Sequence, residues 1–303
     1  MLHRRDFIKR SLAAGALLSA GAFPLEAFAA EELTKITILH TNDQHSRIDP
    51  FPMDGSKNQG CGGFAKRAAV IHAFRQKEKN VLLLDSGDIF QGTPYFNKFH
   101  GELEIDLMNQ MGYDAGTIGN HDFDGGMDNL AMRMQQAKFP FVVANYNFEN
   151  TACAGKAKRY KTFQFGAVRV GVFGVGIEMD GLVPKSAYLE TQYADPVKVA
   201  NETAAHLKHE EHCDFIICLS HLGFKYEENK VSDVVLAEQS ENVDLILGGH
   251  THTFFDAPKS YRNKTGREVL VNQVGWAGIC LGQLEFYFDR KKKAGNRAGL
   301  IKI

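Results

Sequence analysis

Short apolar runs alternate with amphipathic segments along most of the chain. The apolar runs are rich in β-branched and aromatic residues, which is typical of buried strands, and the amphipathic segments have the periodicity of helices. The expected strands are 36–40, 81–85, 115–118, 141–144, 168–175, 215–219, 245–247, 269–272 and 281–288. The expected helices are 64–76, 103–111, 127–137, 196–212 and 231–239. Strands and helices that alternate in this order predict an α/β fold.

The first thirty residues have the order of parts of an export signal. Arg4 and Arg5 precede a weakly apolar stretch, 11–23, and residues 27–29 give the small-x-small pattern of a cleavage site. The basic segment resembles the twin-arginine consensus. We therefore expect residues 1–30 to be a twin-arginine signal peptide that directs export to the periplasm or another extracytoplasmic compartment. The apolar stretch is too short to span a bilayer, so no stable membrane span is expected once the signal is removed.

The remaining chain has ordinary globular composition and reads as one domain. Of its 303 residues 44% are hydrophobic and 23% charged, and a net charge of -1 gives no electrostatic case for a nucleic-acid polymer as partner. Residues 147–161 are expected to form a surface loop. The basic segment 290–303 is expected to be a ragged terminus or the start of a connection, so the domain is expected to cover 31–289.

Side chains capable of metal chemistry gather directly after the predicted strands. They are Asp43, His45, Asp88, Asn120, His121, His221, His250 and His252, with Asp124 close behind the third strand. Because the carboxyl ends of strands converge on one edge of an α/β sheet, these side chains can meet in a single site.

The residue types in these clusters are imidazoles, carboxylates and one amide, without a thiolate. Such a set suits two divalent ions, and zinc, manganese, iron and cobalt are all compatible with it. Asp88 is the best placed carboxylate to bridge them. Two ions about 3.5–4 Å apart can activate a shared water and stabilise the charge that builds on a phosphoryl oxygen. The pattern therefore predicts hydrolysis of a phosphate ester.

Four runs in order along the chain resemble the motifs of a known family. They are 38–45 (ILHTNDQH), 85–88 (DSGD), 108–124 (ending GNHDFD) and 248–252 (GGHTH). Over residues 35–289 the chain resembles the calcineurin-like metallophosphoesterases, and among these the catalytic domain of the exported 5'-nucleotidases. The resemblance implies a four-layer αββα sandwich of two mixed sheets, with the metals at one edge, and it identifies 31–289 as the metallophosphoesterase catalytic domain.

Carried over position by position, the resemblance also implies roles for the site residues. One ion would be held by Asp43, His45, Asp88 and His252, and the other by Asp88, Asn120, His221 and His250. His121 would be a general acid or transition-state stabiliser that Asp124 orients. Asp122 stands where the family often has Glu, and it receives no role.

The function implied by the resemblance is a dinuclear-metal phosphomonoesterase acting on nucleotides or related small phosphate esters. Three other hydrolyses on the same site stay open: those of a nucleotide-sugar pyrophosphatase, a cyclic phosphodiesterase and a thiosulfohydrolase. The exported 5'-nucleotidases carry a second domain that defines the substrate, and this sequence stops at Ile303, about where that domain would begin. We therefore also keep open a metal-bearing subunit that needs a separately encoded substrate-binding domain.

Several other residues receive structural interpretations. His206, His209 and His212 have the spacing of a helix face and are expected at a solvated helix end. His40 is expected to pack behind the first ligand loop. The five cysteines (Cys61, Cys153, Cys213, Cys218 and Cys280) have no C-x-x-C spacing, and their odd number leaves at least one unpaired.

Overall fold

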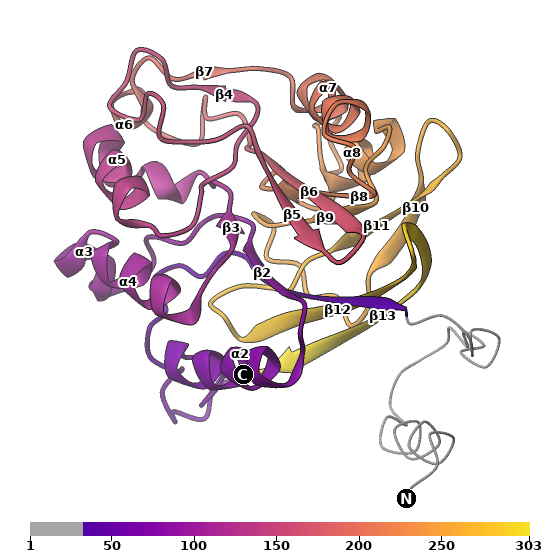
Figure 1. The fold of residues 1–303 in the computed structure, drawn as a ribbon. Helices are drawn as coiled ribbons and strands as arrows, with labels where there is room; N and C mark the ends of the chain where they lie inside the picture. Colours follow the sequence, from indigo (N-terminus) through magenta and orange to yellow (C-terminus); the bar gives the residue numbers. More distant parts are fainter. Residues whose placement is uncertain (1–32) are drawn as a thin grey trace, which may run out of the picture. The chain divides into compact units, whose positions relative to one another are not determined.

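Two mixed β-sheets form the centre of the computed structural model, which describes residues 33–303 (Figure 1). The five-stranded sheet has the order β13 (Lys292–Lys302), β12 (Cys280–Asp289), β1 (Thr34–Thr41), β2 (Val81–Asp85), β3 (Ala115–Gly116). The six-stranded sheet has the order β10 (Lys259–Arg262), β11 (Glu268–Asn272), β9 (Leu245–Leu247), β8 (Phe215–Ser220), β6 (Val168–Val175), β5 (Tyr160–Phe165). A two-stranded ribbon joins β4 (Tyr146–Asn147) and β7 (Gln192–Tyr193). The expected signal peptide lies outside the described residues.

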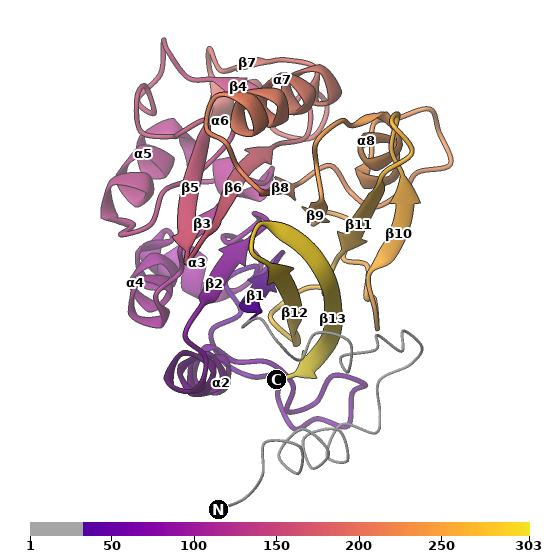
Figure 2. The same cartoon turned by 45° about the vertical axis from the view of Figure 1, so that its right-hand side comes forward.

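Helices cover the outer face of each sheet (Figure 2). Helices α2 (Phe64–Lys77), α4 (Glu102–Met111) and α5 (Gly126–Gln136) share a core with the five-stranded sheet, whereas α7 (Pro196–His209) and α8 (Asp233–Gln239) share one with the six-stranded sheet. The short elements are α3 (Pro94–Phe99), the 3-10 turn η2 (His121–Phe123) and α6 (Lys185–Tyr188). The expected four-layer αββα sandwich is confirmed.

Successive side chains of a strand point to opposite faces of the sheet, so every second residue of the central strands enters the core between the two sheets. Ile36 and Ile38 of β1 face Phe215 and Ile217 of β8 within one buried cluster, whereas Leu39 of β1 joins the cluster on the helix side. The ring of Phe215 lies 4.6 Å from that of Phe286. Because β2 is buried on both faces, its sequence, VLLLD, is almost continuously apolar.

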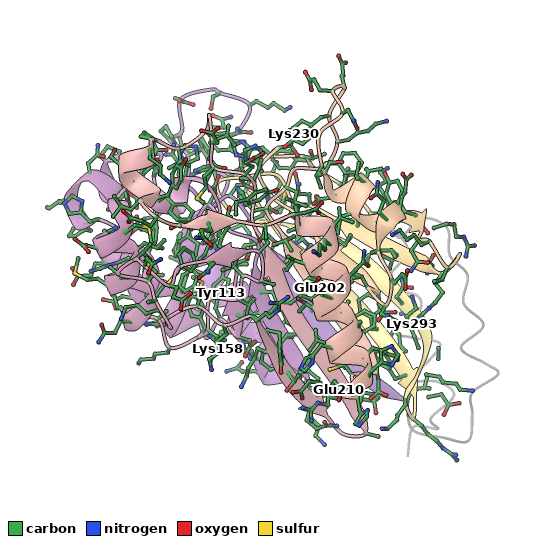
Figure 3. The ribbon with its side chains drawn as sticks, turned by 90° about the horizontal axis from the view of Figure 1, so that it is seen from above. Tyr113, Lys158, Glu202, Glu210, Lys230 and Lys293 are labelled. Atoms are coloured by element: carbon green, nitrogen blue, oxygen red, sulfur yellow. The ribbon has the colours of Figure 1, made fainter. Side chains whose placement is uncertain are left out.

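Helix α7, in the outer layer, also buries one face against a sheet and exposes the other. Ala200, Ala204 and Leu207 are buried against the sheet, while Glu202 lies exposed along the helix and Glu210 at its end (Figure 3). Asp195 caps the first turn by accepting hydrogen bonds from two backbone N–H groups. The histidines expected at a solvated helix end, His206, His209 and His212, are exposed, although the helix ends at His209.

Most expected elements are present within a few residues, and the expected surface loop 147–161 is a mostly exposed run of turns, although Cys153 within it is buried. Two expectations were wrong. Residues 141–144 make only isolated bridges and no strand. The segment after Asp289 is no ragged terminus, because it forms β13, which pairs along β12 from Asp289 to Cys280. Its basic, glycine-containing sequence suits an edge strand, where one side has no neighbour and lysines discourage further pairing.

Membrane-spanning helices are absent from the part of the chain that the structure describes: no helix there is long and apolar enough to cross a bilayer.

The inter-sheet core predicts a large effect of one aromatic side chain. Phe215→Ala should lower the free energy of unfolding by about 3–5 kcal/mol, because it leaves a cavity where the ring contacts Phe286 and Phe288. Urea denaturation measures this. Met132→Ala is the control, since Met132 is 53% exposed, and it should change the value by less than about 0.5 kcal/mol. Equal effects of the two variants would contradict the packing described here.

Candidate metal centre

The loops that carry the predicted site residues meet at one edge of both sheets. The strands β1, β2 and β3 run parallel, as do β6, β8 and β9, so their carboxyl ends point to the same side within each sheet. Contacts join the two sets: Ser86 Oγ donates to the carbonyl of Leu247 at 2.8 Å, and the N–H of His250 donates to the Asp43 carboxylate at 3.0 Å. Residues from both sheets therefore build one site.

Two groups of metal-ligand type lie side by side in this site. Asp43, His45 and His252 form one, and Asp88, His221 and His250 the other, with the potential ligand atoms of each group within 4.8 Å of one another. In the first group, Asp43 Oδ1 lies 3.3 Å from His252 Nε2. In the second, Asp88 Oδ2 lies 3.1 Å from His221 Nε2. Two ligands bound about 2.1 Å from a common ion are about 3.0–3.4 Å apart, so these separations fit metal coordination.

Asp88 lies between the two groups, and Asn120 extends the second. Asp88 Oδ2 is 3.9 Å from His45 Nε2 of the other group. The side-chain oxygen of Asn120 lies 2.8 Å from His250 Nδ1. The structure thus brings together all seven residues that the family resemblance implied as ligands, with Asp88 between the two groups.

His221 is oriented as metal-binding histidines usually are. Its Nδ1–H donates to the backbone carbonyl of Ser86 at 2.7 Å, which leaves the lone pair on Nε2. Nε2 is fully buried and lies 3.1 Å from Asp88 Oδ2, its neighbour in the same ligand group. A lone pair held inward in this way suits a metal ion.

The electrostatics of the site favour positive charge. Burial alone would lower the pKa of His221, but Asp88 and Asp43 outweigh it and raise this pKa to about 10. Burial and the charge of Asp88 raise the pKa of Asp122 to about 7, and burial raises that of Asp233 to about 8. The buried carboxylates therefore carry more negative charge than the neighbouring side chains neutralise. A divalent cation can take the place of the protons that would otherwise compensate this charge.

His121 and Asp124 form a pair at the exposed side of the site. His121 Nδ1 lies 2.8 Å from Asp124 Oδ2, and the His121 side chain is 38% exposed. Its ring lies 5.3 Å from that of His45, and its backbone N–H donates to Asp88 Oδ1 at 2.8 Å. The hydrogen bond to Asp124 raises the pKa of His121 against the opposing effect of partial burial. The arrangement can therefore hold a proton beside the two ligand groups.

Five of the seven candidate ligands have left-handed backbone conformations. Their φ values are 50° at Asp43, 49° at His45, 54° at Asp88, 71° at His250 and 52° at His252. Each such residue costs on the order of 1 kcal/mol or more, and persists only where its surroundings enforce it. The loops are therefore held in place by other contacts.

Asp122 supplies part of that support. Its carboxylate accepts backbone hydrogen bonds from Asp88 (3.0 Å), Ile89 (2.9 Å), Phe90 (3.2 Å) and Gly119 (2.8 Å). It thereby joins the loop after β2 to the loop after β3. The sequence pattern assigned no role to Asp122, because nothing in its neighbours reveals these distant backbone partners.

Asp85 and Gln44 form a second support that the sequence pattern did not reveal. The Asp85 carboxylate accepts hydrogen bonds from Thr41 Oγ1 (2.6 Å), Gln44 Nε2 (2.7 Å) and the N–H of Gly87 (3.0 Å). The side chain of Arg67 in α2 donates to Gln44 Oε1. Helix α2 is thus tied to the loop of Asp43 and His45.

Gly119 is required by the close packing of this edge. A Cβ atom there would lie 2.1 Å from Asp88 Oδ1 and 2.7 Å from His221 Cε1. The glycine before Asn120 and His121 therefore gives room to the shared carboxylate.

His40 and the five cysteines lie outside the two ligand groups and contribute to the packing of the core. His40 is fully buried, with Nε2 2.8 Å from the Asn272 amide, behind the first ligand loop as expected. All five cysteines are buried, and none forms a disulfide within the described chain.

Comparisons with known proteins agree with this geometry. A family model described as calcineurin-like phosphoesterase matches residues 36–254. The snake venom 5'-nucleotidase of Crotalus adamanteus is 34% identical over 86% of this chain and 47% of its own, and the 5'-nucleotidase of Bos taurus 32% over 93% and 50%. The 5'-nucleotidase precursor from Thermus thermophilus superposes with a TM-score of 0.79 at 30% identity, covering 89% of this chain and 54% of that one. The chain spans about half the length of the curated relatives it matches.

The position of Asp122 predicts an effect on metal affinity. Asp122→Asn should weaken Mn²⁺ binding by about 10–100-fold, because an NH₂ group would face backbone N–H donors and release the loop of Asp88. Calorimetric titration of the metal-free protein measures this. Asp128→Asn, an exposed carboxylate in α5, is the control and should bind Mn²⁺ as the unmodified protein does. Unchanged affinity in Asp122→Asn would rule out the supporting role.

Proposed function

Because the chain belongs to the calcineurin-like phosphoesterase family, we propose that it is a metal-dependent phosphomonoesterase that acts on nucleotides. The observation that carries this proposal is the pair of adjacent ligand groups that share Asp88, with His121 and Asp124 beside them. The 5'-nucleotidases among the relatives support the substrate class.

In this proposal each group holds one divalent ion. The ligands of one are Asp43, His45, Asp88 and His252, and those of the other are Asp88, Asn120, His221 and His250. The buried Nε2 of His221, which faces Asp88, and the ligand separations near 3 Å support the fit. Bound divalent ions supply Lewis-acid activation of water and stabilisation of phosphoryl charge. Zinc, manganese, iron and cobalt all suit this donor set.

His121 then assists the leaving group. Its Nδ1–H donates to Asp124, so Nε2 is the atom that can carry a proton toward the substrate. Transfer of that proton to the departing oxygen neutralises the alkoxide as the phosphorus–oxygen bond breaks. Asp124 fixes the ring and stabilises its protonated form.

A second candidate is a metal-bearing subunit that depends on a separately encoded substrate-binding domain. The observation that favours it is that the match covers 47% of the Crotalus adamanteus 5'-nucleotidase and 50% of the Bos taurus 5'-nucleotidase. In that case the small phosphate ester is recognised by both chains, and hydrolysis of nucleotides by this chain alone is slow.

We also propose export by the twin-arginine pathway, with residues 1–30 as the signal and the periplasm or a similar compartment as destination. The Arg4-Arg5 pair and the segment that follows it support this. The catalytic domain then includes β13 up to the end of the sequence, because this strand completes the five-stranded sheet.

Metal removal tests the proposed function. Chelation should abolish hydrolysis of nucleoside 5'-monophosphates, and manganese, zinc or cobalt should restore it. A substrate panel with a nucleotide sugar, a cyclic nucleotide and a protein-bound thiosulfonate separates the alternative hydrolyses. If the protein with both ions bound hydrolyses no phosphate ester, even with a substrate-binding domain added, the proposed function is wrong.

The His121 role predicts a dependence on the leaving group. His121→Ala should lower kcat by about 10²–10⁴-fold for a nucleotide, whose alkoxide leaving group needs a proton. For 4-nitrophenyl phosphate the loss should be much smaller, because its phenolate leaves unprotonated. His206→Ala, at the exposed end of α7, is the control and should leave both rates unchanged. Equal losses on the two substrates would argue against proton donation by His121.

A further inference from the structure

A buried amide at the end of β11 contacts the whole loop that carries His250 and His252. Gln273 has no exposed surface. Its Nε2 donates to the carbonyl of Gly249 at 2.7 Å, and its Oε1 accepts from the N–H of Thr253 at 2.6 Å and from Thr251 Oγ1 at 3.2 Å. One side chain therefore binds the loop before, between and after the two histidines.

The same amide is linked to the loop of His221. Gln273 Nε2 lies 3.5 Å from Asp233 Oδ2, and the other oxygen of Asp233 accepts from Ser220 Oγ at 2.5 Å. Ser220 directly precedes His221. Gln273 and Asp233 thus form a buried connection, here named the amide bracket, between the loops that carry His221 and the two later histidines.

The amide bracket leaves no space for a side chain at Gly248, where the loop begins. A Cβ atom on Gly248 would lie 2.1 Å from Asp233 Oδ2 and 3.0 Å from Gln273 Nε2. The glycine at this position is therefore explained by the bracket, since its own φ is not in the left-handed region.

The loop that the bracket holds joins the two candidate metal groups. His250 belongs to one group and His252 to the other, and both have left-handed backbone conformations, which the loop would abandon if it were released. The placement of this loop therefore sets how far apart the two sets of ligand atoms lie.

We propose that Gln273 is a positioning residue that fixes the separation of the two metal ions by holding the His250–His252 loop through the amide bracket. The inference rests on the proposed dinuclear metal site. The hydrogen bonds of Gln273 reach the backbone of Gly249 and Thr253, the Thr251 hydroxyl and the Asp233 carboxylate, and none of them involves a candidate ligand side chain.

The experiment loads the protein with Mn²⁺ and records its paramagnetic resonance spectrum together with the binding stoichiometry. Two Mn²⁺ ions about 3.5–4 Å apart with a shared ligand give an exchange-coupled signal. Gln273→Leu should lose this coupled signal and bind one of the two ions at least about 10-fold more weakly. Gln273→Glu keeps the acceptor for Thr253 but loses the donor to Gly249, so it should show a reduced coupled signal.

Asn272→Leu is the matched control, because it removes the neighbouring buried amide, whose side chain contacts His40 and not the loop. It should lower thermal stability while keeping the coupled signal. If Gln273→Leu does not fold, Gln273→Glu decides by the same signal. A coupled signal and stoichiometry unchanged in the Gln273 variants would overturn the inference and leave the proposed function standing. Absence of coupling in the unmodified protein would instead contradict the dinuclear site itself.

Discussion

The site contains two carboxylates with almost no exposed surface, Asp43 and Asp88, and the surrounding structure must compensate their negative charge. A buried carboxylate is strongly unfavourable unless charge or hydrogen-bond donors compensate it. Asp43 receives the N–H of His250 and the Asn42 amide, and Asp88 receives the N–H of His121. These donors leave a surplus of negative charge, which explains why imidazoles surround both carboxylates and why the centre suits cations.

The sandwich architecture gives this centre its precision. The carboxylates follow strands of one sheet, and His221, His250 and His252 follow strands of the other, so the packing between the sheets determines the distances in the site. The loops hold left-handed conformations that would relax in isolation. Buried side chains that contact backbone groups, Asp122 on one side and Gln273 on the other, oppose that relaxation. Stability of the core and geometry of the site are therefore coupled.

The sequence predicted those features whose signal lies in residue type. Val81–Asp85 was predicted to the residue because a strand buried on both faces is continuously apolar, and the candidate ligands were recognisable because imidazoles and carboxylates followed such strands. Strand β13 was missed because its pairing depends on β12 and its own residues are basic. Asp122 and Gln273 were missed because most of their hydrogen-bond partners are backbone groups of loops 20 or more positions away, which no local pattern shows.

Anomalous diffraction from crystals grown with Mn²⁺ tests whether this site holds two ions. A dinuclear centre that shares Asp88 gives two peaks about 3.5–4 Å apart. One should lie against Asp43, His45 and His252, the other against Asn120, His221 and His250, with Asp88 in contact with both. A single peak, or peaks that Asp88 does not join, would contradict it.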